Sequence, residues 1–460
     1  MTADEIDIER RHVPEATPAG RVFSRVLTRP LPVAVRGSGA EIWDADGKRY
    51  LDAAGGAIVV NIGHGRESVA RAMADQASRI AFAHGSAFTS EPLEAYAAEL
   101  GPFLPLHEPA IYPVSGGSEA TETALKMARA YHVTRGEPGR QIVIARWGSY
   151  HGNTLGALDL SGRKPLRRPY EGWLGRFRHV SAAYPYRAGE PDAHALGTAE
   201  DAAAELDRVI STTGPTEVAA FVAEPIVGAT LGAVSPPPGY WPAIAEVCRR
   251  YGVLLIADEV MTGFGRTGRW FAMDHFGVRP DIVIAAKGAT GGYWPLGLVA
   301  ADRQVYETIR SKGSFVHGFT YSHSVVGAAV AREVLRILRS EDLVSAAARQ
   351  GELLSAELHA AFDDHPNVGE VRSTGLMAAI ELVGDRETKR PFPRSRQVAE
   401  RTLAAGRDAG VLFYSGTGNA NGVDGDIIMV GPPFVVSDGQ VREMATTMRA
   451  AVDRAIEQPA

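Results

Sequence analysis

The chain has 460 residues, of which 45% are hydrophobic and 22% are charged, as in ordinary folded proteins. Its net charge of −6 and its scattered basic residues argue against a nucleic-acid partner. No apolar run approaches the roughly 18 residues of a membrane span, and the start MTADEIDIER lacks the hydrophobic stretch of a secretory signal. The single cysteine, Cys248, excludes an internal disulfide and fits a reducing compartment. We therefore expect a cytoplasmic protein that needs neither a membrane, a nucleic acid nor a metal.

The first predicted elements are short strands at residues 41–43 and 49–51, within an N-terminal segment of residues 1–75. From residue 76 to 330, short apolar runs alternate with amphipathic stretches such as 118–131 and 241–251. The apolar runs lie at residues 142–145, 219–223, 253–257 and 281–285. Continuous apolar runs are typical of strands buried on both faces of a parallel sheet. This alternation predicts a large α/β domain with a mainly parallel central sheet flanked by helices.

The pattern of apolar and polar residues changes near residue 331, beyond which helical periodicity predominates. Helices are predicted at residues 331–338, 343–362, 396–409 and 438–456, and strands at 377–382 and 426–430. We expect residues 331–460 to form a smaller α+β domain together with residues 1–75.

A glycine-rich turn, Ser115-Gly116-Gly117-Ser118, precedes the predicted helix 118–131. Glycine lets the backbone approach a ligand closely, and a helix N-terminus offers free N–H groups and a positive dipole end to a phosphate. Ser118 could cap this helix and donate its hydroxyl to the phosphate. A plain turn with a serine cap explains the same residues, and taken alone it is the better explanation.

Two charged residues follow buried strands, and each requires a partner. Asp258 comes directly after the run 253–257, where an ionised carboxylate in apolar surroundings is costly unless it is paired. A protonated pyridine nitrogen would pair with it, as would a structural salt bridge or a helix terminus. Lys287 follows the run 281–285, where desolvation would lower its pKa and make it a better nucleophile. A lysine at such a position can also extend to solvent.

The motifs together resemble the class III aminotransferases, which are pyridoxal-phosphate enzymes of fold type I. The resemblance runs from YLDAAGGAIVVNIGHG, near Leu51, to IIMVGPPF, near Pro433. Its most specific part is DEVMTGFGRTGRWFAMDHFGVRPDIVIAAKG, which contains both Asp258 and Lys287.

The resemblance implies roles for the residues around the cofactor ring. Lys287 matches the lysine that binds pyridoxal phosphate as a Schiff base and then moves the proton between the substrate Cα and the cofactor. Asp258 matches the partner of the pyridinium nitrogen. Val260 matches the side chain that packs on one ring face, and Tyr150, followed by His151, matches the aromatic residue on the other face.

The remaining matches concern the phosphate and the partner subunit. Gly116, Gly117 and Ser118 match the phosphate loop, and Glu224 matches a glutamate near the cofactor. Thr320 matches the threonine that reaches the phosphate from the partner subunit, so the resemblance implies a homodimer with active sites at the interface.

Several positions depart from the family pattern and bear on the substrate. Ala229 stands where glutamate-using members carry a second acid, and residues 411–433 lack the arginine expected upstream of the Pro-Pro pair. Met261 replaces a glutamine that often follows the DEV motif. Arg163 is a candidate for holding the acceptor carboxylate, although a surface role explains it equally well. Ile58 stands where several amine-specific members carry an aromatic residue, which suggests a roomier substrate pocket.

These departures resemble the ω-aminotransferase subgroup. The expected reaction moves an amino group from an amine or ω-amino acid to a keto acid, pyruvate above others, by a ping-pong mechanism. One alternative is an isomerase of the same family, such as an aminomutase or racemase, which needs no external acceptor. Another is a homologue that binds cofactor without catalysis, against which the presence of Lys287 and Asp258 argues.

Overall fold

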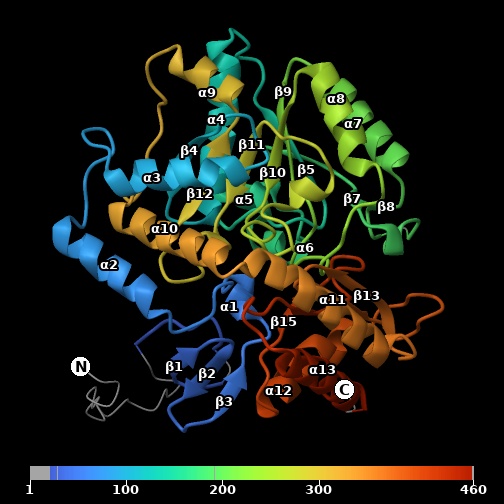
Figure 1. Ribbon diagram of the computed structural model, residues 1–460. Coiled ribbons are helices and arrows are strands. Elements are labelled where there is room, and N and C mark those ends of the chain that lie inside the picture. The colour runs from blue at the N-terminus through green and yellow to red at the C-terminus, as the bar shows by residue number, and fades with distance from the viewer. Residues whose placement is uncertain (1–20, 28, 191, 458–460) are drawn as a thin grey trace.

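A seven-stranded sheet forms the centre of the larger part of the molecule (Figure 1). The computed structural model describes residues 21–457 except 28 and 191. The strands, in their order across the sheet, are β4 (Ala110–Val114), β12 (Gly297–Ala301), β11 (Ile282–Ala285), β10 (Leu254–Asp258), β9 (Val218–Ala223), β5 (Ile142–Arg146) and β6 (Arg178–Val180). Only β12 runs antiparallel to its neighbours among the pairs of this sheet. The expected mainly parallel sheet is confirmed, and the four predicted apolar runs form β5, β9, β10 and β11.

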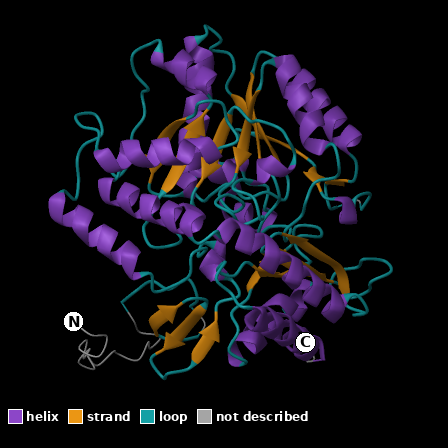
Figure 2. Cartoon of the chain, in the orientation of Figure 1, coloured by secondary structure: helices purple, strands orange, loops and turns teal. Residues whose placement is uncertain are grey.

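Helices cover both faces of this sheet (Figure 2), which explains the continuous apolar strands. In β9, Val222 packs in the apolar cluster that includes α4 (Gly117–Thr134), whereas Phe221 packs in the cluster that includes α7 (Ala199–Thr213) and α8 (Tyr240–Tyr251). Successive side chains of a strand point to opposite faces, so every residue of β9 is buried. The other elements of this part are α5 (Leu155–Leu160), α6 (Lys164–Arg167), β7 (Ala182–Ala183), β8 (Ala195–Leu196) and α9 (Arg303–Arg310).

Three helices pack beside one another next to this sheet. They are α2 (Glu67–Arg79), α3 (Glu91–Leu100) and α10 (Val325–Ser340). The domain boundary predicted at residue 330 falls inside α10, because the apolar stripe of this helix continues from Val326 to Leu338 without a break. The division of the chain at residues 75 and 330 stays a prediction.

The two chain ends meet at the opposite end of the molecule (Figure 1). The N-terminal antiparallel sheet contains β1 (Ala34–Ser38), β2 (Glu41–Asp44) and β3 (Arg49–Leu51), and the turn α1 (Gly55–Ile58) follows it. The C-terminal antiparallel sheet has the order β13 (Val368–Thr374), β14 (Met377–Leu382), β16 (Asp426–Val430) and β15 (Tyr414–Thr417), with helices α11 (Leu343–Phe362), α12 (Val398–Asp408) and α13 (Asp438–Glu457).

Backbone hydrogen bonds join these two regions. The Leu51 N–H donates to the Gly410 carbonyl at 2.8 Å, and the Leu412 N–H donates to the Leu51 carbonyl at 2.9 Å. The Lys48 ammonium caps the end of α12 by donating to the carbonyls of Arg407 and Asp408 at 3.0 and 2.9 Å. Residues 1–20 of the first predicted segment lie outside the described part of the chain.

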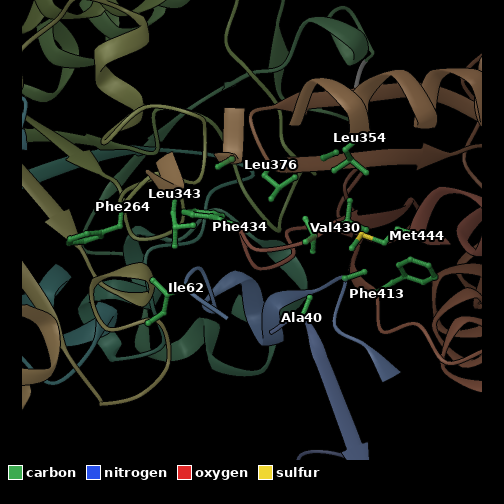
Figure 3. Close-up of a cluster of buried hydrophobic side chains, with 14 of the residues drawn as sticks. Ala40, Ile62, Phe264, Leu343, Leu354, Leu376, Phe413, Val430, Phe434 and Met444 are labelled. Carbon is green, nitrogen blue, oxygen red and sulfur yellow. The ribbon is translucent and has the colours of Figure 1, made fainter. Parts of the chain in front are cut away.

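One apolar core continues from the chain ends into the region below the central sheet. Figure 3 shows Ala40 and Ile62 of the N-terminal region in the same buried cluster as Val430 and Phe434 of the C-terminal region, with Phe264 from the middle of the chain. Removing one such large side chain typically costs about 3–5 kcal/mol of stability, so the core binds the three regions firmly.

A buried ion-pair cluster links the C-terminal sheet to the larger part of the molecule. The carboxylate of Glu381, on β14, accepts hydrogen bonds from Arg187 Nε at 2.5 Å, Asn419 Nδ2 at 2.8 Å and Arg372 Nη1 at 2.8 Å. The hydroxyl of Tyr184 donates to the same carboxylate. Burial alone would raise the pKa of Glu381, but the charges of Arg372 and Arg187 outweigh it and hold the pKa below its usual value.

Among the described helices, none is both long and apolar enough to cross a membrane.

Candidate active site

A cavity of about 440 Å³ opens where the parallel strands of the central sheet end. The end of β10 and the loops that follow β5, β9 and β11 each bring polar side chains to it. Nine of the ten predicted cofactor contacts line this cavity: Gly116, Gly117, Ser118, Tyr150, His151, Glu224, Asp258, Val260 and Lys287.

Lys287 begins the turn that follows β11, and its backbone is strained. Its φ of 45° lies in the left-handed region, which a side-chain-bearing residue rarely adopts and which clusters at functional sites. Burial lowers the pKa of its ammonium group to about 8, although the charge of Asp258 acts in the opposite direction. The amine is therefore far more often neutral near pH 8 than an ordinary lysine, as a nucleophile requires.

Asp258 ends β10 and pairs with a histidine. Its Oδ2 lies 2.7 Å from Nδ1 of His151, and its Oδ1 accepts a hydrogen bond from the Val260 N–H at 3.0 Å. Burial would lower the pKa of His151, but its hydrogen bond to Asp258 and the charge of Glu224 raise the pKa above its usual value. His151 and Asp258 are 107 positions apart, so the sequence alone does not show that they pair. Its only signal was that His151 follows Tyr150 in the motif.

The helix α4 begins at the cavity with a glycine cap. Gly116 is its N-cap residue and makes no side-chain bond, so the predicted capping role of Ser118 is wrong. Ser118 lies within the first turn, and its hydroxyl accepts a hydrogen bond from the Asn153 N–H at 3.0 Å. A Cβ on Gly117 would lie 3.3 Å from Cγ1 of Val260, so glycine keeps this turn close to the ring-packing side chain. The 18-residue helix directs free N–H groups into the cavity, as anion binding requires.

Glu224 follows β9, and only one of its two carboxylate oxygens accepts a hydrogen bond within the described structure. Its Oε1 accepts a hydrogen bond from the Tyr150 N–H at 3.2 Å, whereas its Oε2 lies 3.6 Å from Arg146 Nη2, too far for a hydrogen bond. Burial raises the pKa of Glu224, and the nearby charges of His151 and Arg146 offset only part of that rise. Glu224 Oε2 and His151 Nε2 are both buried without a hydrogen-bond partner among the residues described here.

These features fit pyridoxal phosphate. Buried polar atoms normally have partners, so the two unpartnered atoms mark a place for a bound group. Asp258 supplies a negative charge, the start of α4 supplies phosphate donors, and Val260 and Tyr150 flank the space between them. The charges and shape of the cavity thus match the three parts of the cofactor.

Three predicted contacts lie elsewhere. The side chain of Ile58 is buried in an apolar cluster with Met377 and Met429 and does not line the cavity, because its φ of 56° turns the chain there; the neighbouring Val59 lines the cavity instead. Arg163 lies beside the cavity but is not part of its lining. Thr320 is exposed and away from the cavity of its own chain, so its predicted role, which needs a partner subunit, stays a prediction.

Sequence reasoning missed Trp294, which lines the cavity just after the Lys287 turn. The signal was the run GGYWPLG, in which an aromatic residue follows a glycine turn at the site. Like Ala229 and Met261, which also line the cavity, Trp294 is neutral.

Known proteins resemble the chain along nearly its whole length. The sequence profile described as Aminotransferase class-III matches residues 23–452. The putrescine–pyruvate aminotransferase of Pseudomonas aeruginosa is 35% identical over 92% of this chain and 90% of its own length. The diaminobutyrate–2-oxoglutarate transaminase of Halomonas elongata is 36% identical over 98% and 96%.

Solved structures agree with these relatives. The (S)-enantioselective omega-transaminase from Thermomicrobium roseum superimposes with a TM-score of 0.88 at 39% identity, covering 96% of this chain and 97% of its own. The omega transaminase from Pseudomonas jessenii, solved in complex with PMP, has a TM-score of 0.88 at 31% identity and covers 97% and 98%.

Proposed function

Because the chain belongs to the class III aminotransferase family, we propose that it moves an amino group from an amine or ω-amino acid to pyruvate by a ping-pong reaction. The family membership confirms the resemblance of the sequence motifs and the expected fold type I. The protein is an aminotransferase, and its cofactor is pyridoxal phosphate. The acceptor, the mechanism and the roles of individual residues belong to the proposal.

The proposed cofactor site uses the residues that line the cavity. Gly116, Gly117 and Ser118 at the start of α4 hold the phosphate, and Asp258 pairs with the pyridine nitrogen while His151 holds the Asp258 carboxylate in place. When bound, the cofactor supplies an electron sink for the carbanion formed at the substrate Cα. Lys287 would hold the cofactor through its amine and would move the proton at that carbon.

The observation that supports pyruvate most directly is the distribution of charge in the cavity. The ionisable side chains that line it are Tyr150, His151, Glu224, Asp258 and Lys287, and the described lining contains no arginine. A second carboxylate, such as the distal group of 2-oxoglutarate, would lose water there without gaining an arginine as its partner. Pyruvate places a methyl group at that position and avoids this cost.

A homodimer is part of the proposal, with Thr320 of each chain reaching the phosphate of the other. Two apolar side chains in the same segment as Thr320 support it, because Val316 is 93% exposed and Tyr321 is 68% exposed. Exposed apolar side chains of this kind are available for an interface with another chain. We also propose a cytoplasmic location, on the sequence arguments given above.

The test compares kcat/KM for pyruvate and 2-oxoglutarate with one good amine donor. An unpaired buried charge costs about 1–3 kcal/mol, so pyruvate should be preferred by about 10- to 10²-fold. Equal or better use of 2-oxoglutarate contradicts the proposed acceptor. Turnover of an amino compound without any added keto acid would instead favour an isomerase.

A further inference from the structure

We propose that Asn61 is a positioning residue for Lys287, because its side-chain amide binds the turn that begins at this lysine. The inference rests on the proposed function, in which the Lys287 amine holds the cofactor and moves the proton at the substrate carbon. Asn61 lies in the N-terminal region, between α1 and α2, and is 1% exposed. It does not line the cavity, so it acts on the cofactor site only through the turn.

The side-chain amide of Asn61 links separate segments of the chain. Its Nδ2 donates to the Gly288 carbonyl at 3.0 Å and, over a longer distance of 3.4 Å, to the Phe264 carbonyl. Its Oδ1 accepts from the Ile62 N–H at 2.9 Å, and the reverse orientation of the amide would set this oxygen against two carbonyl oxygens. Gly288 directly follows Lys287, and its carbonyl accepts from no other donor in the part of the chain that the structure describes.

Two glycines of the turn leave room for this amide. A Cβ on Gly288 would lie 3.0 Å from Asn61 Nδ2, and a Cβ on Gly291 would lie 2.8 Å from Asn61 Oδ1. Gly291 also has a φ of 58°, in the left-handed region that favours glycine. The turn therefore packs directly against the amide in addition to accepting its hydrogen bond.

The strained backbone of Lys287 makes this contact important. A φ of 45° at a residue with a side chain persists only where the surrounding structure enforces it. Within the turn, the Lys287 carbonyl accepts from the N–H groups of Thr290 and Gly291 at 3.2 and 3.1 Å. The bond from Asn61 to the next carbonyl adds a constraint from outside the turn. Without it, the peptide after Lys287 can rotate, and the amine at the end of the side chain moves with it.

A second contact binds the far end of the turn to the same N-terminal segment. The hydroxyl of Tyr293 donates to the Gly63 carbonyl at 2.8 Å and accepts from the Arg66 N–H at 2.8 Å. The segment is itself attached to the C-terminal region, because the Phe434 N–H donates to the Asn61 carbonyl at 2.7 Å. The turn is therefore bound at both ends, and Asn61 binds the end that carries the lysine.

The position of the lysine amine affects the reaction more than it affects substrate binding. A base must lie within hydrogen-bond reach of the proton that it moves, and a displacement of about 1 Å can cost about 10²-fold in rate. The initial binding of the amine donor does not require this group. A displaced turn should therefore slow the chemical step and leave the donor concentration at half-saturation nearly unchanged.

The experiment compares Asn61→Ala with Asn367→Ala in the holoenzyme. Asn367 is the matched control in the C-terminal region, because its Nδ2 also donates to a backbone carbonyl, that of Val383, at 3.0 Å. In the half-reaction with one amine donor, we expect the saturating rate to fall about 10- to 10²-fold in Asn61→Ala, with half-saturation within about 2-fold. Asn367→Ala should keep both values. Chemical denaturation of the two variants measures the loss of stability separately from the rate.

A second readout does not depend on turnover. Borohydride fixes the cofactor to the chain only where the Lys287 amine holds it. In Asn61→Ala, a smaller fraction of the bound cofactor should be fixed than in the wild type, whereas Asn367→Ala should match the wild type.

A milder variant acts at the other end of the turn. Tyr293→Phe removes one hydroxyl and its two hydrogen bonds, so we expect the saturating rate to fall about 2- to 10-fold with half-saturation again nearly unchanged. This variant decides the case if Asn61→Ala does not fold.

Two outcomes overturn the role of Asn61. One is a wild-type rate together with a wild-type fixed fraction in Asn61→Ala, or in Tyr293→Phe if it alone folds. The other is an equal loss of rate in Asn61→Ala and Asn367→Ala, because such a loss would come from stability alone. If the wild type transaminates no amine, the proposed function fails, and the fixed fractions still decide whether Asn61 positions Lys287.

Discussion

Two buried glutamates of this protein have opposite surroundings. Glu381, on β14, is fully buried, and four side chains donate to its carboxylate, two of them arginines. Glu224, at the cavity, is 7% exposed, and one of its carboxylate oxygens makes no hydrogen bond within the described structure. Their pKa values move apart accordingly, because the arginine charges lower that of Glu381 while burial raises that of Glu224.

The difference separates a structural site from a binding site. A carboxylate whose every oxygen has donors stabilises one arrangement of the chain and leaves nothing for a ligand. A carboxylate with an unpartnered oxygen, close to His151 with an unpartnered nitrogen, leaves donors and acceptors for a bound group. Burial alone, which the two residues share, does not distinguish these roles.

The largest expected effect comes from removing the charge at the structural site. Glu381→Gln leaves Arg187 and Arg372 buried without their shared anion, so we expect a loss of about 3–5 kcal/mol in the free energy of unfolding. Chemical denaturation of the holoenzyme measures it. Glu370→Gln is the matched control, because Glu370 pairs with the same Arg372 but is 35% exposed, and it should cost less than about 1 kcal/mol. Equal costs for the two variants would show that Glu381 has no special structural role.

Lys287→Ala tests the binding site, where we expect the variant to lose activity and to keep its stability. Loss of a positioned base should lower turnover by at least about 10²-fold, while the start of α4 still holds the cofactor phosphate. Borohydride reduction should fix the cofactor to the wild-type chain and not to the variant. The control Lys126→Ala, at an exposed lysine of α4, should keep both properties. Near wild-type transamination in Lys287→Ala would refute its assignment.

The lowered pKa of Lys287 predicts how the apoprotein takes up its cofactor. Only the neutral amine attacks the aldehyde, and burial places this pKa at about 8. The rate of reconstitution should therefore rise about 10-fold per pH unit below pH 8 and level off above it. Stopped-flow absorbance measures the rate. A rate that keeps rising tenfold per unit up to pH 10 would indicate an ordinary lysine.

The smallest effect is expected for Glu224→Gln, and its sign depends on pH. The raised pKa of Glu224 means that the unfolded chain ionises first, so this residue costs stability as the pH rises above 4.5, the usual pKa of a glutamate. Glutamine removes that cost, so the variant should match or exceed the wild type by up to about 1 kcal/mol at pH 8. Glu381 should behave oppositely, because its lowered pKa gives stability that is lost as the pH falls below that value. Unfolding curves of the wild type and of both variants from about pH 3 to pH 8 test the contrast.

Local patterns predicted the parts of the fold that depend on local chemistry. The continuous apolar runs gave β5, β9, β10 and β11, and the helical period gave α11 with its observed ends. The antiparallel β12 was missed, because the five-residue run that follows the glycine turn carries no sign of its direction. Direction in a sheet depends on the connection, which the residues of the strand do not encode.

The site shows the same limit. Lys287 and Asp258 could be identified because each follows a strand within a specific motif. The partnership of Asp258 with His151 could not, since it joins distant segments, and neither could the exclusion of Ile58 from the cavity. The lining of a substrate pocket depends on the backbone conformation of single residues. Here the positive φ of Ile58 accompanies the placement of Val59, and not Ile58, in the lining.

The hydrogen bonds that join β3 to the end of α12 also set an order of events during synthesis. Lys48 donates to the carbonyl of Arg407, which lies 359 residues further along the chain. At about 5–20 residues per second, a ribosome needs about 20 to 70 s to make that stretch. The N-terminal strands thus leave the ribosome long before their partners exist, whereas β9, β10 and β11 are made within a stretch of fewer than 70 residues, from Val218 to Ala285. The central sheet should therefore assemble first on the nascent chain, and the two chain ends should close onto it last.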